Sequence, residues 1–361
     1  MENIQACLNY IGSKKSLLDF IDYVIKKVNN RLKTEDSSQI SFFDGFAGTG
    51  IVSKYFNRKY NYKTISNDLE YYSYLISYSN LKVPYTEKLR NLIIHLDQLT
   101  QTNNENYNLI TKNYSPSGED NRMFWTETNT QKADAIVEEI NNRLENETID
   151  QDEWKFLMAS LLVSIDKVAN TASVYEAYLK QFKKTAQNQF KLIPVHNSSI
   201  IVNQDNNTVF NLDINSPLIF ETEYDIIYLD PPYNERQYSS NYNTLNYIAR
   251  YDSKLEIYGK AGLIKNYNKS KFCSKANAEK EFSQIISKLK AKYILVSYNN
   301  EGIISQDNFI EILKNKGRVT LYKKIYKKFK SSDKQENETV FEYLYLCSVN
   351  KEGPYREYIL K

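Results

Sequence analysis

A short strand that runs into a glycine-rich turn, followed by a second strand that ends in an acid, constrains the fold of this chain most. Residues 40–43 predict the first strand, residues 45–50 supply the turn with three glycines, and helical spacing follows. The second strand, residues 63–66, ends at Asn67 and Asp68, and another helix is expected from Glu70. The order strand, helix, strand, helix is typical of parallel α/β winding.

The pattern changes to helical periods with almost no strand signal between residues 84 and 184. Ser13 is placed to cap an earlier helix whose apolar positions run from Leu17 to Val28. Two further helices are expected at residues 133–144 and 153–168, and five further strands at residues 200–202, 224–229, 293–298, 318–322 and 342–349. We therefore expect a discontinuous catalytic domain of residues 1–83 and 195–361, a mainly helical insertion of residues 84–194, and a polar loop insertion of residues 251–278.

Length and composition limit the class of protein. A chain of 361 residues, 41% hydrophobic and 25% charged, suits about two soluble domains, or one with a large insertion. No apolar run approaches the roughly 18–20 residues that a bilayer requires, and no secretory signal is visible, so we expect a cytoplasmic protein without a membrane partner. The three cysteines share no close spacing and there are only two histidines, so we expect no metal site and no disulfide framework.

The glycine turn and the two acids beside it predict a ligand. The spacing G-x-x-G-x-G differs from the G-x-G-x-x-G of dinucleotide enzymes, and an ordinary tight turn is the alternative for the glycines alone. Asp44, at the end of the first strand, would repel a pyrophosphate and attract an ammonium group. Asp68, at the end of the second, is placed to accept hydrogen bonds from ribose hydroxyls. Together they suit a nucleoside that carries a positively charged amino acid, namely S-adenosylmethionine.

A second motif, Asp230-Pro231-Pro232-Tyr233, follows the strand predicted at residues 224–229. The Asp230 carboxylate and the Pro231 carbonyl can each accept one N–H of an exocyclic amino group and so direct its lone pair toward a methyl donor. The prolines add no competing N–H donor, and the Tyr233 ring offers a face on which an extruded base can stack. A rigid loop whose Asp caps the next turn is the alternative for this motif alone.

In these motifs and their order the chain resembles the DNA adenine-N6 methyltransferases, specifically the Dam-like group. The resemblance implies a Rossmann-like methyltransferase sheet with helices on both faces, together with a helical insertion. It implies the catalytic residues Asp230, Pro231, Pro232 and Tyr233 and the cofactor-binding residues Tyr10, Lys14, Asp44, Gly45, Phe46, Gly48, Thr49, Gly50, Asp68, Asp213 and Asp230. Two segments, residues 170–180 and 234–242, resemble one branch of the group. Residues 80–191 do not resemble the recognition domain of Dam itself, so no base-reading residue is carried over.

The predicted activity is transfer of a methyl group from S-adenosylmethionine to N6 of a flipped adenine in double-stranded DNA. The alternatives are an RNA adenine or DNA cytosine-N4 methyltransferase, or a non-catalytic DNA-binding subunit of the same fold. A cognate restriction endonuclease is a candidate partner. Of the two insertions, residues 251–278 are the stronger candidate for target recognition, because they are polar, basic and close in sequence to Asp230.

Overall fold

A single sheet of eight strands organises the described part of the chain. The computed structural model describes residues 8, 12–32, 39–326 and 340–360. The strands are β1 Ser41–Asp44, β2 Lys63–Asn67, β3 Thr208–Phe210, β4 Glu223–Leu229, β7 Lys290–Asn299, β8 Gly317–Tyr326, β9 Val340–Val349 and β10 Arg356–Leu360. Their order in the sheet is β10-β8-β9-β7-β4-β1-β2-β3. All neighbouring pairs are parallel except the two that β9 makes with β7 and β8. The predicted parallel α/β order is confirmed.

Helices cover both faces of this sheet because the strand side chains alternate between two apolar cores. Phe42 of β1 packs with α1 (Leu18–Leu32) and α2 (Ile51–Tyr60) on one face. Its neighbour Phe43 packs on the other face with apolar residues of three further helices. Those helices are α8 Pro217–Glu221, α11 Ala278–Lys288 and α12 Gln306–Lys314.

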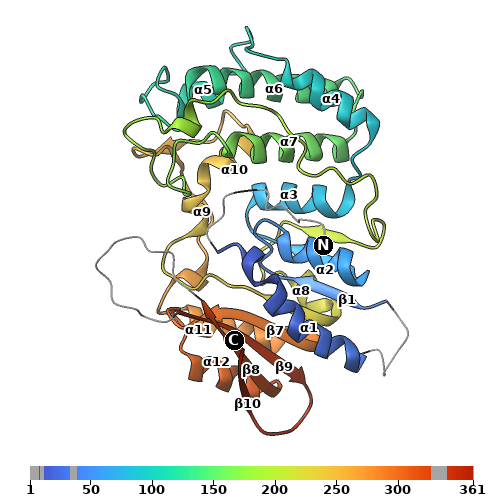
Figure 1. The fold of residues 1–361 in the computed structure, drawn as a ribbon. Coiled ribbons are helices and arrows are strands. Elements are labelled where there is room, and N and C mark those ends of the chain that lie inside the picture. The colour runs from blue at the N-terminus through green and yellow to red at the C-terminus, as the bar shows by residue number, and fades with distance from the viewer. Residues whose placement is uncertain (1–7, 9–11, 33–38, 327–339, 361) are drawn as a thin grey trace.

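A separate helical layer lies above the sheet in Figure 1 and contains α4 Glu87–Asp97, α5 Leu109–Tyr114, α6 Glu127–Glu145 and α7 Gln151–Asp166. It shares one hydrophobic core with α3 (Tyr71–Lys82) and with α10 (Asn243–Arg250). The start of α7 is fixed by a capping box, in which Asp150 accepts from the Glu153 backbone and Glu153 accepts from the Asp150 backbone. The helix α3 is therefore in contact with the helical layer along its apolar face and begins beside the carboxyl end of β2.

The polar segment that begins near residue 251 is not a free loop, because its first part is a hairpin of β5 (Ile257–Tyr258) and β6 (Leu263–Ile264) attached to the helical layer. The buried Arg122 donates to the carbonyls of Gly259 and Lys260 in the hairpin and to that of Asn113. The Tyr114 hydroxyl donates to the Gly262 carbonyl. The two sequence insertions thus contact each other.

Two local expectations are wrong. Residues 200–202 form no strand, and the side chain of Ile200 is 78% exposed. The sheet edge is formed instead by β3, which pairs with β2 a few residues later. Ser13 precedes a short 3-10 helix, Lys14–Leu17, but its hydroxyl makes no capping hydrogen bond.

Candidate active site

The sheet places the two sequence motifs side by side. The strand order reverses at β1, because β2 and β3 extend to one side of it while β4 and β7 extend to the other. Ligands of open α/β sheets bind at such a reversal, beyond the carboxyl ends of the strands. Asp44 ends β1, Asp68 follows β2 and Asp230 follows β4, so all three acids reach the same edge.

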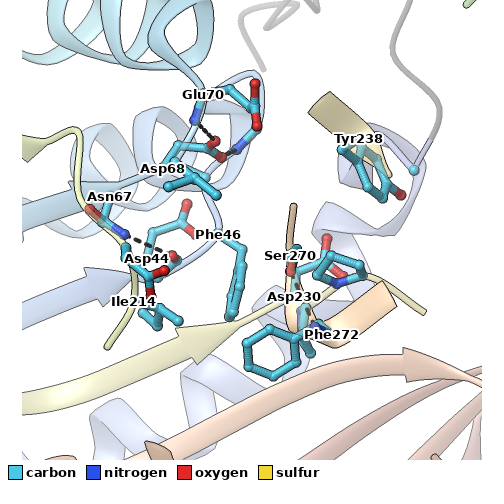
Figure 2. A pocket seen from close by; sticks show the side chains of 18 of the residues that line it. Asp44, Phe46, Asn67, Asp68, Glu70, Ile214, Asp230, Tyr238, Ser270 and Phe272 are labelled. Atoms are coloured by element: carbon cyan, nitrogen blue, oxygen red, sulfur yellow. Dashed lines mark hydrogen bonds between the residues drawn. The ribbon is translucent and has the colours of Figure 1, made fainter. Parts of the chain in front are cut away.

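These acids line one pocket, shown in Figure 2. Of the predicted site residues, the pocket wall contains Lys14, Asp44, Gly45, Phe46, Gly48, Thr49, Asp68, Asp213, Asp230, Pro231, Pro232 and Tyr233. Gly50 lies directly beside the wall at the start of α2. Tyr10 lies outside the described residues, so its role stays a prediction.

The glycine turn has a backbone conformation that other residues rarely adopt. Gly48 has φ +54° and Gly50 has φ +69°, both in the left-handed region. A side chain at Gly50 would also meet the Ser77 hydroxyl at 2.7 Å. The turn therefore packs closely against α3, and its residues Gly48 and Thr49 line the pocket at the start of α2.

Asp44 has one carboxylate oxygen without a partner. The Ser53 hydroxyl donates to Oδ2 at 2.7 Å, whereas Oδ1 is buried and no described group bonds it. Burial raises the pKa of Asp44 to about 7, and the nearby acids Asp230 and Asp68 add to the shift while Ser53 opposes it. A buried acceptor with no partner is costly on its own, so this oxygen is suited to a cationic donor from a ligand.

Asp68 holds the glycine turn as well as facing the pocket. Its Oδ2 accepts from the Gly48 backbone N–H at 2.7 Å, and its Oδ1 accepts from the Glu70 N–H at 2.9 Å. Burial raises its pKa to about 6, and these backbone hydrogen bonds oppose the shift. Each carboxylate oxygen has a second lone pair, so Asp68 can still accept a hydrogen bond from a ligand. Asp213 lies at the exposed rim, where its carboxylate accepts from the Asn215 backbone and side chain.

Asp230 is paired with Lys14, whose Nζ lies 2.8 Å from Asp230 Oδ2 and 3.3 Å from the Gly12 carbonyl oxygen. Burial raises the pKa of Asp230 above the usual range, and the Lys14 ammonium opposes that shift. For Lys14, burial lowers the pKa, but the attraction of Asp230 and Glu342 outweighs it and the net shift is upward. The pair therefore favours a charged Lys14 beside the carboxylate of the D-P-P-Y motif.

Tyr233 is fixed from two directions. Its carbonyl accepts from the Ile303 N–H at 3.0 Å, and its ring meets the Tyr298 ring edge-on with centroids 6.4 Å apart. Lys14 Nζ lies 5.9 Å from the Tyr233 ring centroid. The ring is thus held in one orientation at the pocket wall, as a stacking surface requires.

The end of the polar insertion closes the pocket opposite the glycine turn. Phe272 meets Phe46 edge-on, with ring centroids 5.2 Å apart (Figure 2). Ser270 is joined to Gln237 by two hydrogen bonds, from Ser270 N to Oε1 at 2.7 Å and from Nε2 to the Ser270 carbonyl at 3.1 Å. The Cys273 thiol donates to the Arg236 carbonyl. Residues 269–272 therefore belong to the pocket wall and are bonded to the loop that follows Tyr233.

Several wall residues were not among the predicted site residues, namely Glu70, Ile214, Tyr238, Ser239, Ser270, Phe272 and Glu281. Ser270, Phe272 and Glu281 come from segments far from the motifs in sequence, so spacing could not identify them. Glu70 offered a weak signal, since it lies two residues after Asp68. Phe272 offered another, as one of few aromatic residues in a polar segment.

The sequence has three lysine clusters that are candidates for phosphate contacts, at residues 180–191, 260–275 and 323–330, and several of these lysines are paired with acids. Lys265 lies 2.7 Å from Glu256, Lys271 lies 3.7 Å from Glu281, and Lys275 lies 3.4 Å from Glu235. Lys327, Lys328 and Lys330 of another lysine cluster lie outside the described residues. Among the described residues, no cluster of three or more His, Cys, Asp or Glu could hold a metal ion, and no helix is both long and apolar enough to cross a bilayer.

Comparison with known proteins identifies the family of this chain. Residues 10–312 match the family model described as D12 class N6 adenine-specific DNA methyltransferase. The chain is 37% identical to the Type II methyltransferase M.CviAII of Paramecium bursaria Chlorella virus 1, over 95% of this chain and 99% of the relative. It is 38% identical to the Type II methyltransferase M.NlaIII of Neisseria lactamica, over 94% and 98%. It is also 36% identical to the Type II methyltransferase M.FokI of Planomicrobium okeanokoites, over 94% of this chain and 52% of that protein. The chain therefore belongs to the D12 class of N6 adenine-specific DNA methyltransferases, which confirms the family and the enzymatic activity predicted from its motifs.

Proposed function

We propose that this enzyme binds S-adenosylmethionine and a flipped adenine of double-stranded DNA in the pocket between β1 and β4, and transfers the methyl group to N6. One observation carries the proposal. Asp44, whose Oδ1 has no hydrogen-bond partner among the described groups, and the D-P-P-Y motif line the same pocket from adjacent strand ends. An acceptor for an ammonium group thus lies beside an acceptor for an amino group.

The glycine-turn side of the pocket fits the methyl donor. Asp44 Oδ1 would accept from the ammonium of the amino acid part, and Asp68 from the ribose hydroxyls. Phe46 and Ile214 (Figure 2) supply apolar surface for the adenine ring. Asp213 is an exposed residue of the same pocket wall. The backbone of Gly45, Gly48, Thr49 and Gly50 permits close approach of the ligand, and Tyr10 is retained from the resemblance.

The D-P-P-Y side of the pocket fits the methyl acceptor. Asp230 and the Pro231 carbonyl would accept the two N–H bonds of the adenine amino group, which is otherwise a poor nucleophile because its lone pair is delocalised. Tyr233 would stack on the flipped base. Such stacking contributes roughly 1–3 kcal/mol, similar to the few kcal/mol that flipping costs.

The chemistry needs only positioning and electrostatics from the protein. When bound, S-adenosylmethionine supplies an electrophilic methyl group, and the electrons of the broken S–C bond remain on sulfur. Asp230 would orient N6 for in-line attack and stabilise the positive charge that develops on that atom, and the proton that N6 then loses would pass to solvent. Lys14 holds the Asp230 carboxylate in place.

We further propose that the two insertions read the DNA sequence, with residues 1–83 and 195–361 forming the catalytic domain. Residues 84–194 bring an exposed segment beside the D-P-P-Y loop, where Ser240 donates to Glu176 at 2.6 Å and Tyr175 donates to the Asn241 carbonyl at 2.7 Å. In the insertion of residues 251–278, the exposed side chains of residues 265–269 offer groups for base contacts. The names of the relatives, Type II methyltransferases, support a cognate restriction endonuclease as a partner.

Methylation-sensitive sequencing of DNA from a methylation-free host that expresses this chain tests the activity and identifies the target. Asp230→Ala is expected to abolish methylation and retain affinity for S-adenosylhomocysteine. Asp68→Ala is expected to weaken that affinity about tenfold or more, since a hydrogen bond to a charged group contributes about 1.5–3 kcal/mol. Near-normal single-turnover methylation by Asp230→Ala would refute the catalytic assignment.

A further inference from the structure

Glu70 is a buried acid that belongs to neither sequence motif. It follows Asp68 by two residues and stands at the start of α3, yet its side chain makes no capping bond to that helix. The residue is 6% exposed and its side chain reaches the pocket wall. Its carboxylate therefore points away from its own helix end.

The two carboxylate oxygens of Glu70 bond two other helices. The Ser239 hydroxyl of α9 (Tyr238–Asn241) donates to Oε1, and the Asn246 side-chain amide of α10 donates to Oε2. Asn246 is fixed in this orientation because its Oδ1 accepts from the Tyr72 N–H at 3.1 Å. One buried side chain thus joins the start of α3 to both helices that follow the D-P-P-Y loop.

The backbone of Glu70 is bonded to the other half of the pocket. Its N–H donates to Asp68 Oδ1, and Asp68 Oδ2 accepts from Gly48 of the glycine turn. A continuous series of hydrogen bonds therefore runs from Gly48 through Asp68 and Glu70 to Ser239. Figure 2 shows the contact between Asp68 and Glu70 at the pocket.

Ser239 is next to Tyr238, which also lines the pocket. The Tyr238 and Tyr233 hydroxyls both border Gly12, at 3.0 and 3.6 Å from the position of a Cβ at that glycine, so Tyr238 lies next to the proposed stacking surface. A displacement of Ser239 would therefore move Tyr238 and disturb the position of Tyr233. The Glu70 contacts thus reach the half of the pocket assigned to the flipped base.

We propose that Glu70 is a positioning residue that couples the two halves of the pocket, so that the methyl donor and the target base each strengthen the binding of the other. The inference rests on the proposed function, since it uses the two ligands assigned above. Burial raises the pKa of Glu70 to about 7, and its two donors and Arg250 oppose the shift. Both carboxylate oxygens accept here, which an amide in the same place cannot reproduce.

The test exchanges the amide and the carboxylate. In Glu70→Gln only one oxygen remains to accept, so the bond from Asn246 is kept only if the new Nε2 turns to Ser239 and reverses the direction of that bond. Both bonds also lose the carboxylate charge that strengthens them. Asn246 itself cannot turn without losing its bond to Tyr72. When Glu70→Gln is combined with Asn246→Asp, the new amide at position 70 can donate to the new carboxylate at position 246. That carboxylate also keeps an acceptor for the Tyr72 N–H, so the double variant restores the hydrogen bonds and the total charge. Glu223→Gln, at an exposed site at the amino end of the central strand β4, is the matched control.

The readout is the affinity for S-adenosylhomocysteine, measured by calorimetry with and without a duplex that the wild type methylates. We expect the duplex to raise this affinity at least fivefold in the wild type and in Glu223→Gln, within the usual range of coupling between two sites. In Glu70→Gln, the factor by which the duplex raises the affinity for S-adenosylhomocysteine should fall below twofold. The affinity in the absence of DNA should change less than threefold. It should return to at least threefold in the double variant.

The inference would be overturned if Glu70→Gln had the same coupling factor as the wild type. It would also be overturned if the wild type methylated DNA while the duplex left its affinity for S-adenosylhomocysteine unchanged. If Glu70→Gln does not fold, Ser239→Ala removes one donor only and should still lower the factor at least twofold. A lower affinity without DNA at an unchanged factor would show a structural role alone, which also overturns it. If the wild type neither binds S-adenosylhomocysteine nor methylates DNA, the proposed function fails instead.

Discussion

The Lys14 ammonium lies 2.8 Å from the Asp230 carboxylate, so a residue that precedes the whole sheet is ion-paired with the acid that follows β4. The resemblance assigned Lys14 to the cofactor alone. The structure adds a contact with the D-P-P-Y motif and places the Lys14 side chain at 7% exposure. The positive charge of this lysine thus lies beside the acid that is proposed to bind the target amino group.

Lys14→Met should make catalysis depend on pH. Burial raises the pKa of Asp230 and the Lys14 ammonium opposes this shift, so the pKa should rise further when the ammonium is removed. The ionised carboxylate is the active form, so activity should be lost as pH falls through this higher pKa and be recovered at higher pH. We expect kcat at pH 7 to fall about tenfold or more, since each pKa unit changes the ionised fraction up to about tenfold. Lys15→Met, at the exposed neighbour, is the control, and an unshifted pH profile in Lys14→Met would contradict the assignment.

The affinity for S-adenosylhomocysteine should fall as pH decreases from 7 to 6. Asp44 has a pKa of about 7, and only its ionised form attracts the ammonium of the ligand. Protonation below this pKa therefore weakens binding, by up to about tenfold for each pH unit. Asp44→Asn should bind weakly and lose this slope, leaving a fall centred near pH 6, the pKa of Asp68. Calorimetry from pH 5.5 to 7.5 checks the prediction, and an equal slope in both proteins would refute it.

Alanine substitutions at Asn266 and Asn268 should relax the target sequence at single base positions. Both side chains are exposed at the tip that follows β6, and the structure assigns them no bond to an acid, unlike Lys265. Contacts to bases alter the preference among sequences, whereas contacts to phosphate weaken binding to all sequences alike. Methylation of a library of site variants distinguishes the two. If both variants lose activity uniformly, the tip contacts only the backbone and the helical insertion becomes the candidate reader.

His196 should make stability depend on pH. Its Nε2 lies 2.9 Å from the Ser79 carbonyl oxygen and 3.0 Å from that of Val83, so it anchors the returning end of the helical insertion to α3. Burial lowers its pKa from 6.5 to about 4. The unfolded chain therefore binds more protons between these values, and the stabilisation present above pH 6.5 is lost as pH falls toward 4.

The contribution of His196 to the free energy of unfolding should change by up to about 3 kcal/mol across this pH range, at about 1.4 kcal/mol for each pKa unit. Urea unfolding at several pH values should show the wild type losing stability relative to His196→Gln across this range. His95→Gln, at an exposed ring, is the control. A constant difference between wild type and His196→Gln from pH 7 to pH 4.5 would contradict the prediction.

Buried strands could be predicted from sequence, and edge strands could not. Residues 226–229 are apolar on both faces because helices cover both sides of β4, and that run can be recognised in the sequence. At one edge, β3 is only three residues long and partly buried, so the apolar pair Ile201-Val202 misled the prediction. At the other edge, β10 is mostly exposed and pairs only with β8, which leaves little hydrophobic signal.

The candidate site shows the same division. Asp44, Asp68 and Asp230 were predictable because each stands at or just after the end of a readable strand. Glu70 and Phe272 were not, because their roles depend on contacts with residues about 170 or more positions away, Ser239 for the first and Phe46 for the second. Contacts between such distant segments leave no spacing in a single sequence.

The position of α3 has a consequence for exchanging target specificity between enzymes of this kind. One end of this helix reaches the pocket proposed for the methyl donor through Glu70, and its apolar face is part of the core of the helical layer. A helical layer transplanted at residue 84 would meet a foreign helix surface, with Leu75 and Ile76 packed against the wrong partners. Chimeras should therefore be joined before Glu70 and should also carry α9 and α10, so that the graft includes both sides of the Ser239 and Asn246 contacts.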